Sequence, residues 1–248
     1  VTTFHNAYGA DSWLKRRYNS VMARGDRVIA ISRFVEAHAA APSGIGPARL
    51  RIIDRGVDLD NFHPDRVTAS RIVRLAEAWR LPDGVPVIML PGRLTSWKGH
   101  EVLIEALSWL GRRDVYCLFI GAGRDRYRQT LERHIATLGL GGLCQFIDHC
   151  SDMPAAYMLA DIVVSASTRP EGFGRVIAEA LAADMDRPGQ AHRRLVADDR
   201  VERIVLVLGG GQTHFDGPMV VLDKGGDFGV RVPSKPLVPS RGAVEIGD

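Results

Sequence analysis

Two glutamates bracket a glycine-rich turn in the segment TRPEGFGRVIAE, residues 168–179. Gly172 and Gly174 would let backbone N–H groups approach an anion closely, and the helix expected after them adds its positive end. Glu171 and Glu179 are about 12 Å apart along a helix that spans both, too far for an acid/base pair acting on one bond. They could instead bind two distant hydroxyl groups of one extended ligand. The plainer alternative is an ordinary helix start with an acidic residue near its positive end.

A second group of polar residues lies in the segment PGRLTSWKGH, residues 91–100. Arg93 and Lys98 follow an expected strand and precede an expected helix, where parallel sheets commonly bind their ligands. A guanidinium fork and a compact ammonium group both suit a diphosphate. A solvated basic turn is the alternative. We consider it weaker because the sequence shows no evident carboxylate partner for the two cations.

The alternation of strand and helix patterns predicts how these two loops are held. Between residues 87 and 183, short apolar runs alternate with segments of helical periodicity. We expect strands at 87–90, 115–121, 143–147 and 161–165, and helices at 99–110, 125–138, 153–159 and 175–183. This order favours right-handed βαβ crossovers and an α/β, Rossmann-like parallel sheet covered on both faces.

The patterns before and after this region are shorter. Strands are expected at 1–5, 27–31 and 50–53, helices at 12–24 and 66–80, and a helix N-cap at Ser32. The helix at 12–24 places apolar residues on one side and basic residues on the other. These are Trp13, Tyr18, Val21 and Met22, opposite Lys15, Arg16 and Arg17. Beyond residue 184 the periodicity weakens. Strand-like pieces remain at 204–208, 219–222 and 229–232, and the first could supply a fifth strand to the sheet.

The composition limits the class of protein. The chain has 248 residues, a formal net charge of +3 and 46% hydrophobic residues, as in an ordinary globular protein. This charge is too small to predict nucleic-acid binding. Three cysteines without close pairing argue against a disulfide framework or a zinc site, so a cytoplasmic setting fits best. We expect no membrane span and no signal peptide, since Val1 opens directly on a strand pattern.

Several longer motifs resemble family 4 of the retaining glycosyltransferases, which have the two-domain GT-B fold. PGRLTSWKGHEVLIEAL, HCSDMPAAYMLADIVVSAS and PEGFGRVIAEAL are similar to the donor-binding domain of that family. HNAYGA, WLKRRYNSVMARGDRVIAIS and IDRGVDLDNFHP are similar to the last third of its acceptor-binding domain. The resemblance implies an acceptor-side part at 1–64, a helix and linker at 65–86, a donor-binding Rossmann-like domain at 87–183 and a divergent tail at 184–248.

The resemblance also implies roles for individual residues. Glu179 would bind the ribose of a nucleotide, and Glu171 would contact hydroxyl groups of the transferred sugar. Arg93 and Lys98 would hold the diphosphate and stabilise its charge as it leaves, together with backbone N–H groups of the loop Gly172, Phe173 and Gly174. The catalytic set would be His5, Glu171, Arg93 and Lys98, with His5 near the sugar and the acceptor. The loop facing the base would contain His149, Cys150, Asp152 and Met153. No enzymic nucleophile, bound metal or separate cofactor is implied.

The implied activity is transfer of a hexose from a UDP-sugar or GDP-sugar to a saccharide or glycolipid acceptor, with retention. Bacterial lipopolysaccharide or surface polysaccharide synthesis is the implied setting, in the cytoplasm or at the inner face of its membrane. The basic side of 12–24 could touch an anionic membrane, although a solvated helix face is an equal alternative. Two other functions compete: a catalytically inactive nucleotide-binding fragment of the same fold, and a nucleotide-sugar epimerase.

The resemblance stops near residue 183. The sequence shows no match to the first strands of the acceptor-side domain. From Asp184 onward it no longer matches the family pattern. This switch predicts a reading-frame change or a fusion near Asp184, which resequencing of the coding DNA would test. Residues 184–248 are then expected to be poorly packed or loosely added to the sheet.

Overall fold

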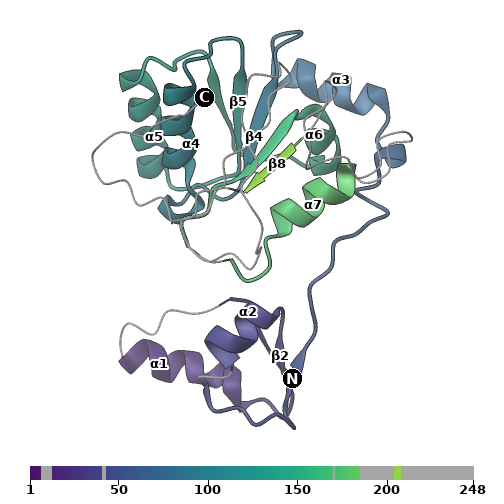
Figure 1. Ribbon diagram of the computed structural model, residues 1–248, viewed down its shortest axis with the longest axis vertical. Coiled ribbons are helices and arrows are strands. Elements are labelled where there is room, and N and C mark those ends of the chain that lie inside the picture. The colour runs from purple at the N-terminus through teal and green to yellow at the C-terminus, as the bar shows by residue number, and fades with distance from the viewer. Residues whose placement is uncertain (7–12, 41–42, 170, 185–203, 208–248) are drawn as a thin grey trace, which may run out of the picture.

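The computed structural model describes residues 1–6, 13–40, 43–169, 171–184 and 204–207. Two parallel sheets organise them, a three-stranded sheet near the N-terminus and a five-stranded sheet in the larger part (Figure 1). An extended segment joins the two parts and leads into helix α3 (Ala69–Ala78).

The five-stranded sheet is parallel throughout, with strand order β6-β5-β4-β7-β8. Its strands are β4 (Val87–Pro91), β5 (Tyr116–Ile120), β6 (Cys144–Ile147), β7 (Ile162–Ser165) and β8 (Ile204–Val207). The register pairs Val87 with Tyr116, Cys117 with Cys144 and Ile162 with both Ile88 and Ile204. The central strand β4 is buried along its whole length, as its apolar sequence predicts for a sheet covered on both faces.

Helices cover both faces of this sheet (Figure 1). Ile88 and Leu90 of β4 pack in one core cluster with α4 (His100–Leu110) and α5 (Asp125–Thr137). The alternate residues Val87 and Met89 pack in a second cluster with α6 (Met153–Leu159) and α7 (Arg175–Asp184). Helix α3 packs on α6 on that second side. Side chains that alternate along β4 therefore serve two separate cores.

The smaller part contains the parallel strands β1 (Thr2–Phe4), β2 (Val28–Ala30) and β3 (Leu50–Ile52), in that order. Its helices are α1 (Trp13–Asn19), the 3₁₀ segment Ser20–Arg24, and α2 (Arg33–Val35), which continues as a π-helical turn over Glu36–Ala40. A compact apolar cluster forms its core: Phe4, Val28, Ala30, Ile31, Phe34, Val35 and Ile45. Ser32 caps α2 as predicted, since its side chain accepts a hydrogen bond from the Val35 N–H at 3.1 Å.

Two predictions about helices were wrong in part. The helix expected at 12–24 changes to 3₁₀ geometry at Ser20, and its apolar side is not buried. Trp13, Tyr18 and Val21 are exposed, because no described element packs over them, while Met22 lies against the small core. The helix expected at 66–80 begins only at Ala69, because Thr68 is extended after the 3₁₀ turn Pro64–Arg66.

Of the stretch expected as a strand at 204–208, the described residues 204–207 do form one. Strand β8 (Ile204–Val207) pairs in parallel with β7 and becomes the fifth strand of the sheet. The other strand-like pieces, 219–222 and 229–232, lie outside the described residues, as does most of the predicted divergent tail.

Candidate functional site

The order of the strands predicts a crevice beside β4. From β4 the chain moves through β5 and β6 toward one edge, and β7 and β8 then extend the sheet on the other side of β4. The loop after β4 leads to α4 on one face, and the loop after β7 leads to α7 on the opposite face. Loops that diverge from neighbouring strands leave a crevice at their carboxyl ends, where open α/β sheets bind ligands. Both segments singled out in the sequence lie there.

Lys98 and Glu171 meet at this crevice. The Lys98 ammonium donates to Glu171 Oε1 at 2.8 Å, and the Ser167 hydroxyl donates to the same oxygen. Both side chains are largely buried, with exposed fractions of 16% and 17%. The expectation that Lys98 has no carboxylate partner was therefore wrong. The sequence could not show this pair, because only the pairing of β4 with β7 brings the two loops together.

Close backbone packing holds the two loops at this distance. Gly99 has a left-handed backbone with φ 76°, and a Cβ atom there would overlap the carbonyl group of Ala166 in the facing loop. The Thr168 N–H also donates to the Trp97 carbonyl at 2.8 Å. Glycine is required at position 99 because it alone combines this conformation with this approach. The ion pair thus lies between two loop backbones that contact each other directly.

Arg93 lies on the same loop as Lys98 but differs from it in exposure. Its side chain is exposed and forms no ion pair with a described residue. The neighbouring backbone is fixed, since the Gly92 N–H donates to Ile120 at 2.8 Å and the Leu94 N–H donates to Ala122 at 3.0 Å. Arg93 is therefore a cation presented to solvent from a fixed loop beside the crevice.

Glu179 is buried, with an exposed fraction of 8%. The Tyr157 hydroxyl of α6 donates to its Oε2 at 3.0 Å, and Arg175 donates to its Oε1 through Nη2 at 2.6 Å and Nε at 3.1 Å. Burial and the adjacent Glu179 carboxylate raise the pKa of Tyr157, so its hydroxyl stays protonated. Glu171 precedes α7 and Glu179 is in its second turn, so the two carboxylates belong to different backbone segments.

The loop of Gly172, Phe173 and Gly174 touches the smaller part of the molecule. A Cβ atom on Gly172 would lie 2.5 Å from the carbonyl oxygen of His5, at the end of β1. Phe173 packs against the small core, and the Gly174 carbonyl accepts the first hydrogen bonds of α7 from Ile177 and Ala178. The structure therefore places His5, whose side chain is exposed, beside the loop that carries Glu171.

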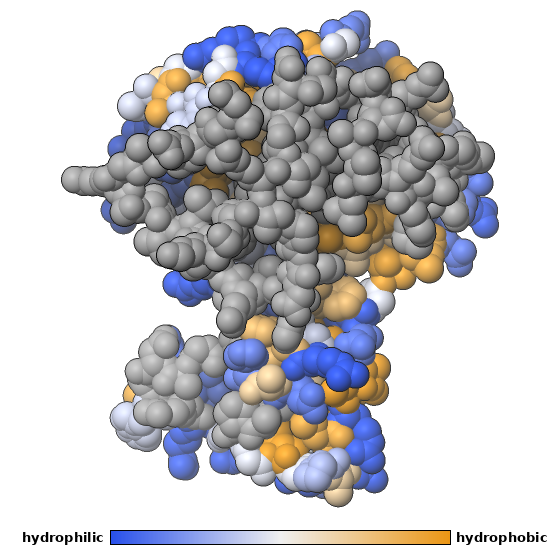
Figure 2. Space-filling view, viewed as in Figure 1, coloured by the Kyte–Doolittle hydropathy of each residue, from blue (hydrophilic) through white to orange (hydrophobic). Residues whose placement is uncertain are grey.

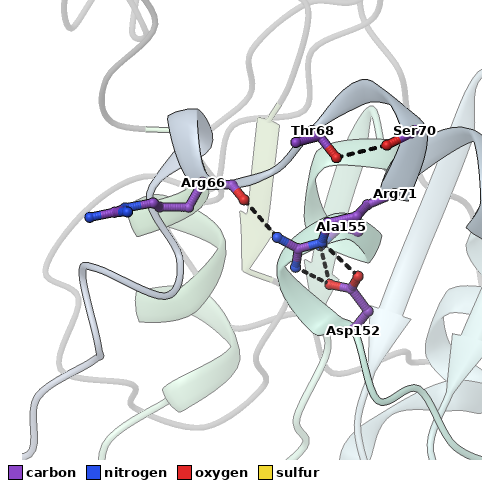
Figure 3. Close-up of polar contacts among 6 residues, drawn as sticks. All are labelled: Arg66, Thr68, Ser70, Arg71, Asp152 and Ala155. Atoms are coloured by element: carbon purple, nitrogen blue, oxygen red, sulfur yellow. Dashed lines mark hydrogen bonds and ion pairs between the residues drawn. The ribbon is translucent and has the colours of Figure 1, made fainter.

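The segment expected to face the base has a structural anchor at Asp152. This carboxylate caps α6 by accepting from the Ala155 N–H at 3.1 Å (Figure 3). Arg71 of α3 donates to both of its oxygens, at 2.6 and 2.9 Å. The hydrogen bonds from Arg71 hold the pKa of Asp152 below its ordinary value. Both oxygens of Asp152 are therefore engaged in the fold, which the sequence did not predict.

The other three residues of that segment differ in exposure. His149 is exposed, whereas Met153 is half-buried against the second core cluster. Cys150 is also half-buried, and burial raises the pKa of its thiol. Of these residues, His149 is thus the most accessible to a ligand.

Comparison with known proteins assigns the two parts. Residues 74–185 match the family model of glycosyl transferases group 1, and residues 1–61 match that of Glycosyltransferase Family 4. The chain therefore contains glycosyltransferase group 1 and family 4 domains. A glycosyltransferase from Rickettsia africae ESF-5 has a similar structure, with a TM-score of 0.66 and 35% identity over 83% of this chain and 50% of that chain. The fold is GT-B.

Two further relatives have names that include a nucleotide sugar. Anabaena Alr3699/HepE, solved in complex with UDP-glucose, has a TM-score of 0.66 and 25% identity over 82% of this chain and 57% of that chain. The GDP-mannose-dependent alpha-(1-6)-phosphatidylinositol monomannoside mannosyltransferase of Mycolicibacterium smegmatis is 33% identical over 63% of this chain and 42% of its own length. The chain spans less than half the length of the curated relatives that it matches.

The group 1 domain contains supporting residues that sequence reasoning missed. His100, the first residue of α4, is fully buried between Phe119 and Tyr127, and neither ring nitrogen makes a hydrogen bond of good geometry with a described residue. Burial lowers its pKa to about 4, so the ring is neutral at pH 7. A neutral ring beneath the Arg93–Lys98 loop supports it without adding charge. Arg175, the ion-pair partner of Glu179, was also missed, although its i,i+4 spacing from Glu179 is a sequence signal.

The described residues meet the requirements of neither a metal site nor a membrane-spanning helix. No group of three or more His, Cys, Asp or Glu side chains in them could hold a metal ion. No helix among them is long and apolar enough to cross a membrane.

Proposed function

We propose that this chain forms the donor site of a glycosyltransferase that moves a hexose from a UDP-sugar or GDP-sugar to a saccharide or glycolipid acceptor, with retention. The observation that carries the proposal is the Lys98–Glu171 contact at the crevice beside β4. It joins a phosphate-binding cation and a hydroxyl-binding carboxylate at one point, as a diphosphate bonded to a sugar requires.

The contacts of Glu171 leave one of its carboxylate oxygens available to a ligand. Lys98 and Ser167 both donate to Oε1, which leaves Oε2 for sugar hydroxyl groups. The ammonium of Lys98 can then interact with the β-phosphate while it remains beside Glu171. With Arg93 and the N–H groups of Phe173 and Gly174, it would stabilise the negative charge that develops on the leaving diphosphate.

Glu179 would accept hydrogen bonds from the ribose. Tyr157 and Arg175 fix its carboxylate in a buried position, and Oε2, which accepts only from Tyr157, retains a further lone pair for a hydroxyl donor. The neighbouring segment with His149 would face the base, while His5 would face the sugar and the acceptor. The names of the relatives include both UDP-glucose and GDP-mannose, so both bases belong in the test.

The smaller part would contact the acceptor and the membrane that carries it. Trp13, Leu14 and Tyr18 are exposed on α1 beside the basic residues Lys15 and Arg17, a combination suited to an anionic lipid surface. Figure 2 shows hydrophobic and hydrophilic surface side by side on the visible face of this part. A cytoplasmic enzyme at the inner membrane face, acting in lipopolysaccharide or surface polysaccharide synthesis, is the setting we propose.

A binding titration tests the donor site. UDP, GDP, UDP-glucose and GDP-mannose are titrated against the wild-type chain, Glu179→Ala and the control Glu105→Ala, which alters an exposed glutamate of α4. We expect one nucleotide series to bind the wild type and the control equally, and Glu179→Ala to bind about tenfold or more weakly, since it loses hydrogen bonds to a charged acceptor. Binding that survives Glu179→Ala would contradict the role of Glu179.

The two competing functions are less well supported. The matched family models and the solved neighbours are those of glycosyltransferases, so an inactive nucleotide-binding fragment is not favoured. Production of an epimerised nucleotide sugar, without an acceptor, would support the epimerase alternative instead.

A further inference from the structure

Ser32 makes a contact that joins the two parts of the chain. Its hydroxyl donates to the Gly172 carbonyl at 2.6 Å, across 140 positions of sequence. The same oxygen accepts from the Val35 N–H at 3.1 Å as the N-cap of α2. A hydroxyl has one proton and two lone pairs, so the proton goes to the donor-site loop and a lone pair to the helix.

The contact acts on the loop that follows Glu171. Glu171 is held from the side of β4 by Lys98 and Ser167. Gly172, the next residue, is buried with its backbone against the His5 carbonyl, and Phe173 packs on the small core. Ser32 is thus the hydrogen-bonding anchor on the side opposite Lys98.

The orientation of one peptide unit connects Ser32 with the ligand. The Gly172 carbonyl and the Phe173 N–H belong to the same planar trans peptide, so they point in opposite directions. Because the carbonyl is directed at Ser32, the Phe173 N–H is directed away from Ser32. Phe173 N–H is one of the groups assigned above to the diphosphate.

We propose that Ser32 is a positioning residue that orients the Gly172–Phe173 peptide, and with it Glu171, toward a bound nucleotide diphosphate sugar. This inference rests on the proposed function for its ligand. It assigns to the acceptor-side part a direct share in holding the donor, through a residue that need not touch the donor itself.

Three variants separate this role from helix capping. Ser32→Gly removes the hydroxyl proton without adding charge and costs the helix cap only a few tenths of a kcal/mol. Ser32→Thr keeps both the proton and the cap. Ser32→Asp keeps a capping oxygen but places a carboxylate against the Gly172 carbonyl, so it cannot donate.

The experiment has a ligand-free measurement and a ligand-bound measurement on the full chain. Amide hydrogen exchange reports the loop 171–174 without nucleotide, and we expect about tenfold faster exchange there in Ser32→Gly and Ser32→Asp, with Ser32→Thr like the wild type. Titration then compares UMP with UDP-glucose, or GMP with GDP-mannose if the wild type binds that series. We expect Ser32→Gly to weaken the sugar nucleotide about tenfold and the monophosphate less than twofold, because the monophosphate lacks the groups that the loop would contact.

The outcomes distinguish the two proposals. If the wild type binds the nucleotides but loop exchange is unchanged in Ser32→Gly, the role of Ser32 is overturned alone. Equal weakening of the monophosphate and the sugar nucleotide would also overturn it, because that pattern indicates a general loss of structure. If the wild type binds no nucleotide, the proposed function fails, and the donor-positioning role of Ser32 fails with it.

Discussion

The ion pairs Arg71–Asp152 and Lys98–Glu171 each join distant segments of this chain, and they use their carboxylates differently. In Arg71–Asp152, both carboxylate oxygens accept hydrogen bonds from the protein, and one of them also caps α6. In Lys98–Glu171, both described contacts end on the single oxygen Oε1. In the first pair, contacts within the protein engage both carboxylate oxygens. The second is buried more deeply yet leaves acceptor capacity at a crevice, which is a property of a binding site.

The largest expected effect comes from separating the loops that carry Lys98 and Glu171. Gly99→Ala would force a Cβ atom into the carbonyl group of Ala166, so we expect the unfolding free energy to fall by more than about 3 kcal/mol. Gly84→Ala is the matched control, since Gly84 has a similar φ of 69° with open space around it, and should cost about 1 kcal/mol. Urea denaturation measures both. Equal losses would mean that loop contact at Gly99 does not matter.

The next effect separates the two cations by function. Lys98→Met should weaken UDP or GDP binding about 100-fold, because a charge-assisted contact to the diphosphate is lost. Arg71→Met should change the same affinity less than about threefold, because its carboxylate partner, Asp152, caps α6 and stabilises the fold. Isothermal titration of the two variants gives the comparison directly. A similar loss of affinity in both would contradict the distinction drawn between the pairs.

A third prediction concerns stability at Asp152. Asp152→Ala removes a helix cap and an ion pair, so we expect the unfolding free energy to fall by about 2 kcal/mol. Asp152→Ser restores a capping oxygen without the charge and should recover roughly half of that loss. Denaturant midpoints at pH 7 measure the three proteins. No recovery in Asp152→Ser would assign the whole effect to Arg71.

The smallest effect is a change of about 1 kcal/mol in the unfolding free energy as the pH falls. Arg71 lowers the pKa of Asp152 in the folded chain, so the ion pair stabilises the fold above the unfolded pKa of about 4. This contribution is lost as the pH falls through the still lower folded pKa. The difference in unfolding free energy between wild type and Asp152→Asn should therefore be constant near pH 7 and shrink below about pH 4. A difference that persists at pH 2 would exclude this carboxylate as its source.

Much of the larger part could be predicted from sequence periodicity. The strands β4 to β7 and the helices α4 to α7 lie within two residues of their expected bounds, since each contains an uninterrupted apolar pattern between turn residues. The smaller part was predicted less well. There, Trp13, Tyr18 and Val21 have a helical apolar pattern yet remain exposed, because periodicity indicates a face that can be buried and not the element that buries it.

The sequence by itself determined which side chains carry suitable chemistry and which strand ends present them. Glycines beside charged residues, after apolar runs, predicted Lys98, Glu171 and Glu179 as candidates. Only the tertiary structure decided the partners: Lys98 with Glu171, Tyr157 with Glu179, Arg71 with Asp152, and Ser32 with Gly172. Local patterns extend over one element, whereas these contacts depend on strand order and on the docking of separate loops, which are properties of the whole fold.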